Sequence, residues 1–290
     1  MEFLQLTIFI SNMSTPILTR SFIELSDTPA SLTVMQWNIL ADSLAIDFPA
    51  VDERYLNWDH RRRLILDEID RVNADILCVE ELDHFEDFLL PHMQEKEFDG
   101  IYNKKPDWHK DGTAIFYRTE ILELLEHHII KFPEGNQFGL YARMRMVKEN
   151  LEFVVVATHL KSKKDFEARR VEETEVILNY LTKDPNLPII ICGDFNSEPT
   201  WETYHHLTSS PLNLHSAYFN TVSPDIEPIY TTYKYRRSLE SRVIDYIWLK
   251  GFKASSVLSI PTPEEIGPNA LPSENYPSDH LSLACKLYLD

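Results

Sequence analysis

The 290-residue sequence is poor in basic residues. Lysine and arginine together number 28 against 46 aspartates and glutamates, which gives a formal net charge of −18. A protein that binds nucleic acid without specificity relies on many Lys and Arg contacts to phosphate, so this deficit argues against a broad nucleic-acid-binding surface. A local basic pocket is still compatible with the composition. The excess of acid fits a protein that collects divalent cations, and equally one that is simply soluble.

The sequence also has few cysteines and no apolar run long enough to span a membrane. All three cysteines lie inside apolar, strand-like runs: Cys78, Cys192 and Cys285. This usage is typical of buried thiols in a reducing compartment and excludes a disulfide framework. The apolar residues 1–10 are too few to cross a bilayer, and no basic segment precedes them as in a secretory signal. We therefore predict a cytoplasmic protein that does not bind membranes. A mitochondrial presequence is the alternative, disfavoured because Arg20 is the only basic residue before Arg54.

Neither an internal repeat nor a low-complexity block divides the chain. Residues 1–30 are polar and rich in Ser and Thr after Ile10, so we predict a flexible N-terminal tail followed by one catalytic domain over residues 31–290. Apolar periodicity predicts helices at 58–72, 85–93, 165–181 and 200–207, and strands at 32–37, 75–79, 113–117, 121–132, 141–147, 151–158, 187–192, 243–249, 254–260 and 281–289. This mixture indicates an α/β sandwich of mixed sheets.

The most informative stretch of the chain is residues 191–197. An apolar run from Leu187 to Cys192 predicts a buried strand, and we expect Gly193 to let the backbone turn sharply after it. Asp194 and Asn196 follow two residues apart. An acid and an amide at one strand end are suited to holding a water against a phosphorus atom. Taken alone, Asp194 could equally be an ordinary turn residue.

Other polar residues also lie in or beside predicted strands, mostly just after their ends. They are Asn38, Glu80, Glu81, His159, Lys161, Asp245, Asp279 and His280. Side chains from several strand ends converge easily on one face of a sheet, as in many catalytic clefts. Their carboxylate and amide oxygens are the ligands that Mg²⁺ or Mn²⁺ prefers. Each residue has a structural alternative as a cap, a turn or a solvated acid. Asp245 is the exception, because a carboxylate flanked by Val, Ile, Tyr and Trp needs a partner.

With these residues in view, the sequence resembles the exonuclease–endonuclease–phosphatase superfamily. Seven motifs match in order: Trp37 to Leu40, Cys78 to Glu81, Asp111 and Gly112, Thr158 and His159, Gly193 to Asn196, Ile244 to Tyr246, and Ser278 to His280. Within the superfamily, the sequence is most similar to the nocturnin-like group of the deadenylase-like branch. The stretches that carry this similarity are residues 34–41, 158–161, 192–200, 266–273 and 275–283. The resemblance implies a four-layer α/β/β/α sandwich of two packed mixed sheets, with the site at one mouth.

The resemblance also implies roles in metal and water binding. Glu81 and Asn38 would hold Mg²⁺, directly or through water, with Mn²⁺ as a possible substitute. Asp279 would join the metal and water network. Asp194, helped by Asn196, would orient the attacking water.

Further implied roles concern protons and phosphate. His280, hydrogen-bonded to Asp245, would handle a proton or stabilise the transition-state charge. His159 would contact a phosphoryl oxygen. Three lysines would bind the substrate phosphate, the last as the weakest candidate: Lys105, Lys161 and Lys163. An aspartate beside His280 would raise the basicity of the imidazole and fix its tautomer.

Two departures from the family pattern bear on the substrate. Glu80 precedes the predicted metal ligand where relatives usually carry Gln, and we expect its charge to raise ion affinity or repel a polyanion. The loop between Pro106 and Asp111 is also short for a nocturnin-like protein.

The implied activity is a Mg²⁺-dependent phosphatase or phosphodiesterase, a hydrolase of ester bonds. The leading hypothesis is removal of the 2′-phosphate from NADP⁺ or NADPH by a monomer, because the acidic composition favours a small nucleotide over a long RNA. The alternative is a 3′–5′ exoribonuclease of the poly(A) deadenylase type, acting on the 3′ end of RNA. A non-catalytic interaction protein on the same fold is the third hypothesis. It is disfavoured because every acid of the motifs and His280 are present. The sequence indicates no required protein partner.

Overall fold

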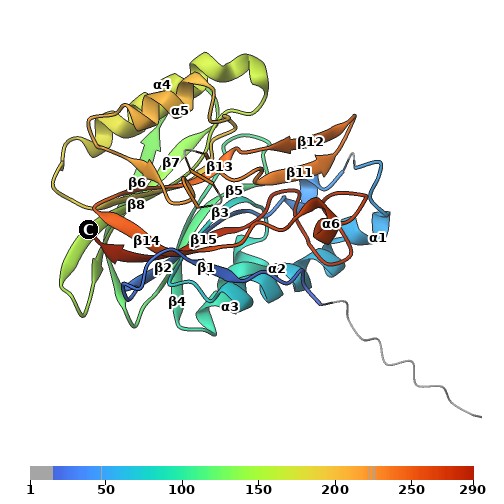
Figure 1. Ribbon diagram of the computed structural model, residues 1–290, viewed down its shortest axis with the longest axis horizontal. Helices are drawn as coiled ribbons and strands as arrows, with labels where there is room; N and C mark the ends of the chain where they lie inside the picture. The colour runs from blue at the N-terminus through green and yellow to red at the C-terminus, as the bar shows by residue number, and fades with distance from the viewer. Residues whose placement is uncertain (1–15, 47, 222, 225) are drawn as a thin grey trace, which may run out of the picture.

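The computed structural model describes residues 16–290 apart from positions 47, 222 and 225, and it contains two large mixed β-sheets (Figure 1). The first sheet has the strand order β1 (Phe22–Glu24), β14 (Phe252–Leu258), β15 (Leu283–Leu289), β2 (Leu32–Asn38), β3 (Ile76–Leu82), β5 (Gly112–Arg118), β4 (Phe98–Lys104). The second has the order β10 (His215–Ser216), β13 (Asp245–Lys250), β9 (Ile189–Asp194), β8 (Leu151–His159), β7 (Phe138–Met146), β6 (Leu122–Lys131). Only β2–β3 and β8–β9 are parallel pairs within these sheets.

The two sheets pack face to face because alternate side chains of each point into a shared apolar core. Val34 and Cys78 of the first sheet and Ala157 and Cys192 of the second belong to this core. All three cysteines are free thiols buried there. The intervening side chains along each strand point to the other face of its sheet. Each sheet therefore has a second apolar face, which must be covered from outside.

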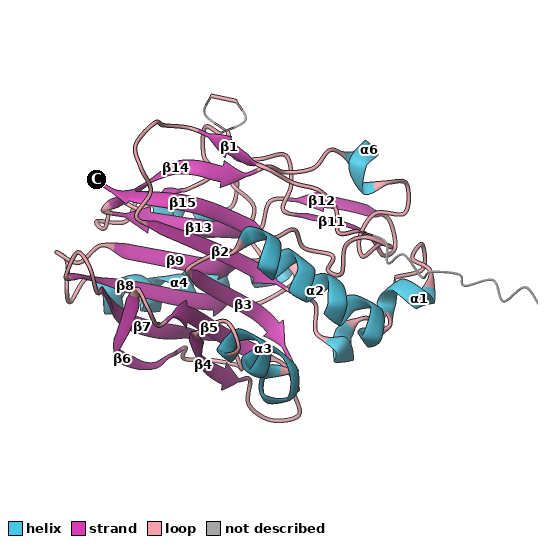
Figure 2. Ribbon diagram, turned by 90° about the horizontal axis from the view of Figure 1, so that it is seen from below, coloured by secondary structure: helices cyan, strands magenta, loops and turns pink. Residues whose placement is uncertain are grey.

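Helices cover both outer faces (Figures 1 and 2). Helices α2 (Trp58–Val72) and α3 (Leu90–Gln94) pack on the first sheet, through Ile65 and Met93 among others. Helices α4 (Glu167–Leu181) and α5 (Glu202–Thr208) pack on the second, through Ile177 and Leu207. The four-layer α/β/β/α sandwich is thus confirmed. In the part of the chain that the structure describes, no helix is long and apolar enough to cross a membrane.

Most predicted elements are confirmed to within a few residues. Helix α2 has the predicted bounds, because its apolar residues at helical spacing lie between two asparagines that cap the helix ends. Asn57 caps its first turn by accepting a hydrogen bond from the Asp59 N–H at 2.9 Å, and Asn73 ends it in the left-handed conformation. The sequence did not predict the elements β1, β4, β10, the hairpin β11 (Thr232–Tyr235) and β12 (Leu239–Arg242), α1 (Glu53–Leu56) or α6 (Pro263–Ile266).

The predicted N-terminal tail is wrong for the residues that the structure describes. Strand β1 pairs antiparallel with β14, so the first sheet begins before residue 30. Arg20 lies buried and forms an ion pair with Glu68 of α2 at 3.3 Å. Residues 1–15 of the predicted tail lie outside the described part of the chain.

The reason predicted for Gly193 is also wrong. Gly193 lies inside β9 and does not turn the chain. A Cβ atom at this position would lie 2.0 Å from the backbone oxygen of Thr158 in β8. A glycine is therefore needed because two strands approach closely at the residue before Asp194.

Candidate active site

Three acidic or imidazole side chains lie side by side at one end of the second sheet. In the strand register Asp194, the last residue of β9, pairs with His159 of β8 on one side and with Asp245 of β13 on the other. All three side chains are buried. The Asp194 carboxylate lies 3.6 Å from His159 Nε2 and 3.8 Å from His280 Nε2. The predicted convergence of strand ends is therefore present in the structure.

The first sheet contributes Asn38 and Glu81 from the ends of β2 and β3. Asn38 Nδ2 donates to Asp194 Oδ2 at 3.1 Å and to Glu81 Oε1 at 3.2 Å, so one amide joins the two sheets. The pairing of β3 with β5 shifts register between Val79 and Leu82, and Glu81 has a positive φ of 54°. This irregularity turns Glu81 towards Asn38.

Asp245 and His280 form the tightest acid–imidazole pair of the site. His280 Nδ1 lies 3.0 and 3.1 Å from the two Asp245 carboxylate oxygens. The Thr231 hydroxyl donates to Asp245 Oδ2 at 2.6 Å, which fixes the carboxylate. Burial of His280 opposes its protonation, but Asp245, Asp279 and Asp194 together outweigh burial and raise the pKa of His280 to about 9. The imidazole is therefore cationic at neutral pH.

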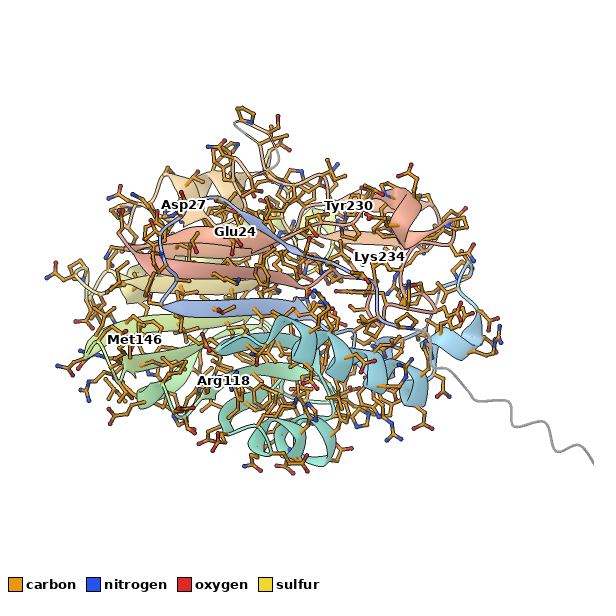
Figure 3. All side chains as sticks on the ribbon, turned by 60° about the horizontal axis from the view of Figure 1, so that its bottom comes forward. Glu24, Asp27, Arg118, Met146, Tyr230 and Lys234 are labelled. Carbon is orange, nitrogen blue, oxygen red and sulfur yellow. The ribbon has the colours of Figure 1, made fainter. Side chains whose placement is uncertain are left out.

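The ionisation of Asp194 and Asp279 differs because their neighbours differ. Burial, together with the charge of Asp245, raises the pKa of Asp194 to about 6. Burial acts on Asp279 in the same direction, but Lys234 donates to its Oδ2 at 2.6 Å and the pKa of Asp279 falls below its ordinary value. Lys234 lies on β11, near Tyr230, in the end of the molecule opposite Met146 (Figure 3).

Asn196 and His159 complete the polar surroundings of Asp194. Asn196, with a φ of 50°, donates its backbone N–H to Asp194 Oδ1 at 2.9 Å and its Nδ2 to the Leu160 carbonyl at 3.1 Å. Burial and the charge of Lys105 lower the pKa of His159 well below its usual range. His159 is therefore a neutral imidazole, and its buried Nδ1 has no hydrogen-bond partner among the residues that the structure describes.

The three predicted phosphate-binding lysines have different surroundings. Lys105 is buried and forms an ion pair with Asp111 at 2.5 Å. Lys161 is half-buried, with its ammonium 5.1 Å from the centre of the Phe166 ring. Lys163 is exposed, but its charge helps burial and Arg169 to lower the pKa of Lys161. Lys105 and Lys161 are thus near enough to His159 for their charges to lower its pKa, whereas Lys163 is not among the charges that act on it.

The surroundings of Glu80 disfavour the charge that we expected it to carry. Its side chain points between the sheets, is fully buried and accepts a hydrogen bond from Gln36 Nε2 at 2.7 Å. Burial raises the pKa of Glu80 well above its usual range, with Cys78, Asp245 and Asp194 adding to the effect. These surroundings disfavour an anionic Glu80 next to Glu81.

The oxygen donors at this end of the sheets fit a hard divalent cation. Among the described residues, the Glu81 carboxylate makes only long contacts, 3.2 Å to Asn38 Nδ2 and 3.4 Å to the Ala41 N–H, so its oxygens are available to a metal. A carboxylate beside an amide is a donor pair suited to Mg²⁺. Asp279, also predicted to join the metal network, has no hydrogen bond to Glu81 or Asn38 in the described part of the chain.

A second group of ligand atoms lies next to this pair. Asp194, Asp245 and His280 offer atoms within 4.8 Å of one another. His280 is a poor ligand there, because its Nδ1 is bound by Asp245 and the ring is protonated at neutral pH. The two aspartates remain available to a cation as oxygen donors.

Sequence patterns missed Lys234, Thr231 and Arg61. Lys234 and Thr231 lie in or beside β11, whose alternation of Thr, Tyr and Lys was a readable strand signal. Arg61 of α2 is buried behind the site and donates from Nε to the Pro277 carbonyl at 2.7 Å and from Nη2 to the Ile39 carbonyl at 2.8 Å. No sequence signal distinguishes Arg61 from the arginines beside it, because only the tertiary structure brings those carbonyls to it.

Residues 35–280 match the Endonuclease/Exonuclease/phosphatase family. The sequence is 38% identical over 299 residues to nocturnin of Homo sapiens, across 93% of this chain and 69% of that protein. The structure of the human nocturnin catalytic domain with a bound sulfate anion has a TM-score of 0.78 and 34% identity, over 93% of this chain and 97% of that one.

A further solved structure resembles the chain in fold. ANGEL2, described as a 2′,3′-cyclic phosphatase in complex with adenosine-2′,3′-vanadate, gives a TM-score of 0.83 at 22% identity, over 94% of this chain and 99% of that one. These similarities confirm the resemblance predicted from the seven motifs. The chain belongs to the Endonuclease/Exonuclease/phosphatase family, within its nocturnin-like group, and is a phosphoester hydrolase.

Proposed function

We propose that this protein is a Mg²⁺-dependent phosphatase that removes the 2′-phosphate from NADP⁺ or NADPH. The observation that carries the chemistry is the row of His159, Asp194 and Asp245 across three neighbouring strands, with His280 bound to Asp245. Water plus the 2′-phosphoester would give inorganic phosphate and the 2′-hydroxyl, with cleavage of the bond between phosphorus and the 2′-oxygen.

Asp194 is the group we assign to the attacking water. A pKa of about 6 makes it ionised at neutral pH and still basic enough to accept part of a proton. Asn38 and the Asn196 N–H each donate to one of its oxygens, which fixes the direction of the carboxylate. A fixed base holds the water in line for attack without reorganisation in the transition state.

The cationic and neutral donors around Asp194 stabilise the charge that grows on the phosphoryl oxygens. His280 carries a positive charge and is held by Asp245. His159 is neutral and can donate from one ring nitrogen. Such preorganised donors stabilise the transition state more than the ground state. Enzymes of this family are metal-dependent, and a Mg²⁺ held by Glu81 and Asn38 would supply further neutralisation of phosphate charge.

Two observations support a small nucleotide as the substrate. The similarity to nocturnin covers nearly the whole chain, and the human nocturnin catalytic domain has been solved with bound sulfate, an anion with the shape of phosphate. The net charge of −18 opposes the approach of a long polyanion, while a few lysines suffice for one phosphate. A reducing, cytoplasmic setting is part of the proposal and is supported by three buried free thiols.

Phosphate release from NADP⁺ and NADPH by the purified protein tests this function. We expect release with Mg²⁺, none after removal of the ion with EDTA, and recovery on its return. Asp194→Ala should lower kcat by about 10²- to 10⁴-fold, the range for loss of a general base. Asp27→Ala is the matched control, because Asp27 is exposed on the β1 side of the first sheet (Figure 3).

A labelled poly(A) oligomer assayed in parallel separates the two enzymatic hypotheses. Shortening of the oligomer without phosphate release from NADP(H) would replace the proposed substrate with RNA. Turnover of neither substrate at micromolar enzyme would contradict the proposal.

A further inference from the structure

One exposed aromatic side chain near the active site has no structural role in the core. Trp108 is 81% exposed, more than any other large apolar side chain in the described part of the chain. Its ring stacks on His109 with centroids 3.9 Å apart and planes 24° apart. Because one face rests on His109 and the side chain is so exposed, the other face of the indole is open to solvent.

The loop that carries Trp108 is held at both ends and at its tip. The Lys105 N–H donates to the Asp111 carbonyl at 2.9 Å, and the Lys105 ammonium pairs with the Asp111 carboxylate at 2.5 Å. His109 Nε2 contacts Asn136 Nδ2 in the turn between β6 and β7. The indole is thus presented by a closed seven-residue loop and rests on a histidine that a neighbouring element holds.

The same loop begins at a phosphate-binding candidate. The Lys105 ammonium is near enough to the site to depress the pKa of both His159 and Lys161. Trp108 follows Lys105 by three positions, so their Cα atoms lie at most about 10 Å apart. A nucleotide with its phosphate beside Lys105 and His159 therefore has its ribose and attached ring within the range of the indole.

On its other side, the β6–β7 turn that contacts His109 is held by the cationic side chain of Arg169. Arg169 of α4 donates to the Glu134 carbonyl at 2.5 Å and to Gln137 Oε1 at 3.2 Å, which ties the β6–β7 turn to α4. Arg169 also pairs with Glu173, which accepts a hydrogen bond from the Lys161 N–H at 2.9 Å. The turn that contacts His109 is therefore held from both sides. An open aromatic face beside lysines is the combination that binds a ring attached to a phosphate.

We propose that Trp108, supported by His109, is a stacking platform for a heteroaromatic ring of the nucleotide substrate, an adenine or a nicotinamide. This inference rests on the proposed phosphoesterase function and adds a subsite that selects for a ring beyond the hydrolysed phosphate. The stacking makes Trp108 a specificity-determining residue that acts on binding, while the acids of the site act on the bond.

Binding of rings without turnover tests the platform directly. NAD⁺, AMP and inorganic phosphate are titrated into the wild-type protein and Trp108→Phe while tryptophan fluorescence is recorded. Trp37 and Trp248 are fully buried and should respond little. We expect saturable quenching by NAD⁺ and AMP but not by phosphate, with most of the quenching absent from Trp108→Phe. Equal quenching in the two proteins would overturn the platform.

Steady-state kinetics provide a second test of the Trp108 platform. Trp108→Ala should raise KM about 5- to 100-fold, as expected for loss of one base–aromatic stack, with kcat nearly unchanged. Trp108→Phe keeps a ring and should restore KM to within a few-fold. Val147→Ala is the control, an exposed apolar residue next to Met146, at the opposite end of the sheets from Lys234 (Figure 3). Because Trp108 is so exposed, its variants should unfold at the wild-type temperature.

The possible outcomes distinguish a failure of the stacking platform from a failure of the proposed NADP(H) substrate. NADP(H) hydrolysis with an unchanged KM in Trp108→Ala would overturn the platform and leave the function standing. Poly(A) shortening that is weakened in Trp108→Ala, without NADP(H) hydrolysis, would support the platform and overturn the NADP(H) assignment. Equal weakening of inorganic phosphate binding and ring binding in Trp108→Ala would show an effect on the anion site and overturn the platform.

Discussion

Two consecutive glutamates, Glu80 and Glu81, show that the direction of a side chain relative to the sheets determines its surroundings. Glu80 points into the core between the sheets, where burial favours its neutral form. Glu81 has a positive φ at the irregular end of β3 and turns towards Asn38. Burial therefore disfavours the charge of the acid that we expected to perturb the metal, while its neighbour faces the amide of Asn38.

A second buried acid, Glu227, gives a prediction about stability. Tyr204 and Ser216 donate to its two oxygens at 2.9 and 3.0 Å, and burial raises its pKa from 4.5 to about 7. Folding favours the protonated form, so the stabilisation is complete below pH 4.5 and is lost as the pH rises to about 7. Glu227→Gln cannot ionise. We expect its free energy of unfolding to exceed that of wild type at pH 8 by up to about 3 kcal/mol.

Urea unfolding at pH 5 and pH 8 measures this difference. Glu149→Gln is the matched control, because Glu149 is exposed in the β7–β8 turn and should follow the wild type at both pH values. The same pH dependence in Glu227→Gln and wild type would show that Glu227 ionises normally in the folded protein.

The residues of the site that sequence could predict are those that stand out against apolar strands. Asp194 and Asp245 interrupt continuous apolar runs, and a buried carboxylate requires a reason. Lys234 belongs to an exposed-looking hairpin with several charged residues. Its partnership with Asp279 arises only because β11 folds over the segment before β15. Charge partners distant in sequence leave no local pattern.

At the scale of elements, the helices and strands that the sequence predicts have a strongly periodic apolar pattern, and those that it missed do not. Helix α2 and the β7–β8 hairpin bury regular faces and were predictable. Strand β1 has three residues, none fully buried, and β12 is half-exposed and largely polar. Both form because a neighbouring strand offers backbone partners, which a sequence window does not contain.

The N-terminal element gives the next prediction. Arg20 donates to Glu68 and Ser282 side chains and to the carbonyls of Ser259 and Ser282. One guanidinium therefore joins the segment before β1 to α2 and to the segment after His280. Arg20→Ala should lower the free energy of unfolding by about 2–4 kcal/mol, since several buried hydrogen bonds to a charged group are lost together. Arg71 keeps Glu68 paired, which limits the loss.

Thermal and urea unfolding of Arg20→Ala and Arg54→Ala measures the effect. Arg54 also pairs with an acid, Asp52 at 2.7 Å, but at an exposed position, so its removal should change stability little. A stability of Arg20→Ala equal to that of Arg54→Ala would mean that the N-terminal segment is not held by this network.

At the scale of the whole molecule, the distribution of charge determines how strongly the binding of a polyanion depends on salt. In the described part of the chain we count four candidate phosphate contacts beside the site: Lys105, Lys161, Lys163 and Arg169. Lys234, His280 and Arg61 are instead buried against Asp279, Asp245 and backbone carbonyls. The rest of the chain brings the net charge to −18. Each phosphate contact releases counterions and contributes about −0.7 to the slope of log K against log salt for a single strand. Four contacts therefore set a limit of about −3.

We expect a labelled 20-nucleotide poly(A) strand to bind Asp194→Ala with a slope shallower than this limit between 50 and 300 mM KCl. Added salt weakens the four attractions, but it also screens the repulsion from the acidic surface, which reduces the slope further. Fluorescence anisotropy provides the measurement, and competition by NAD⁺ in the same titration shows whether the strand occupies the nucleotide site. A slope steeper than about −3 would require an extended basic track on the protein and would favour RNA over a dinucleotide as the substrate.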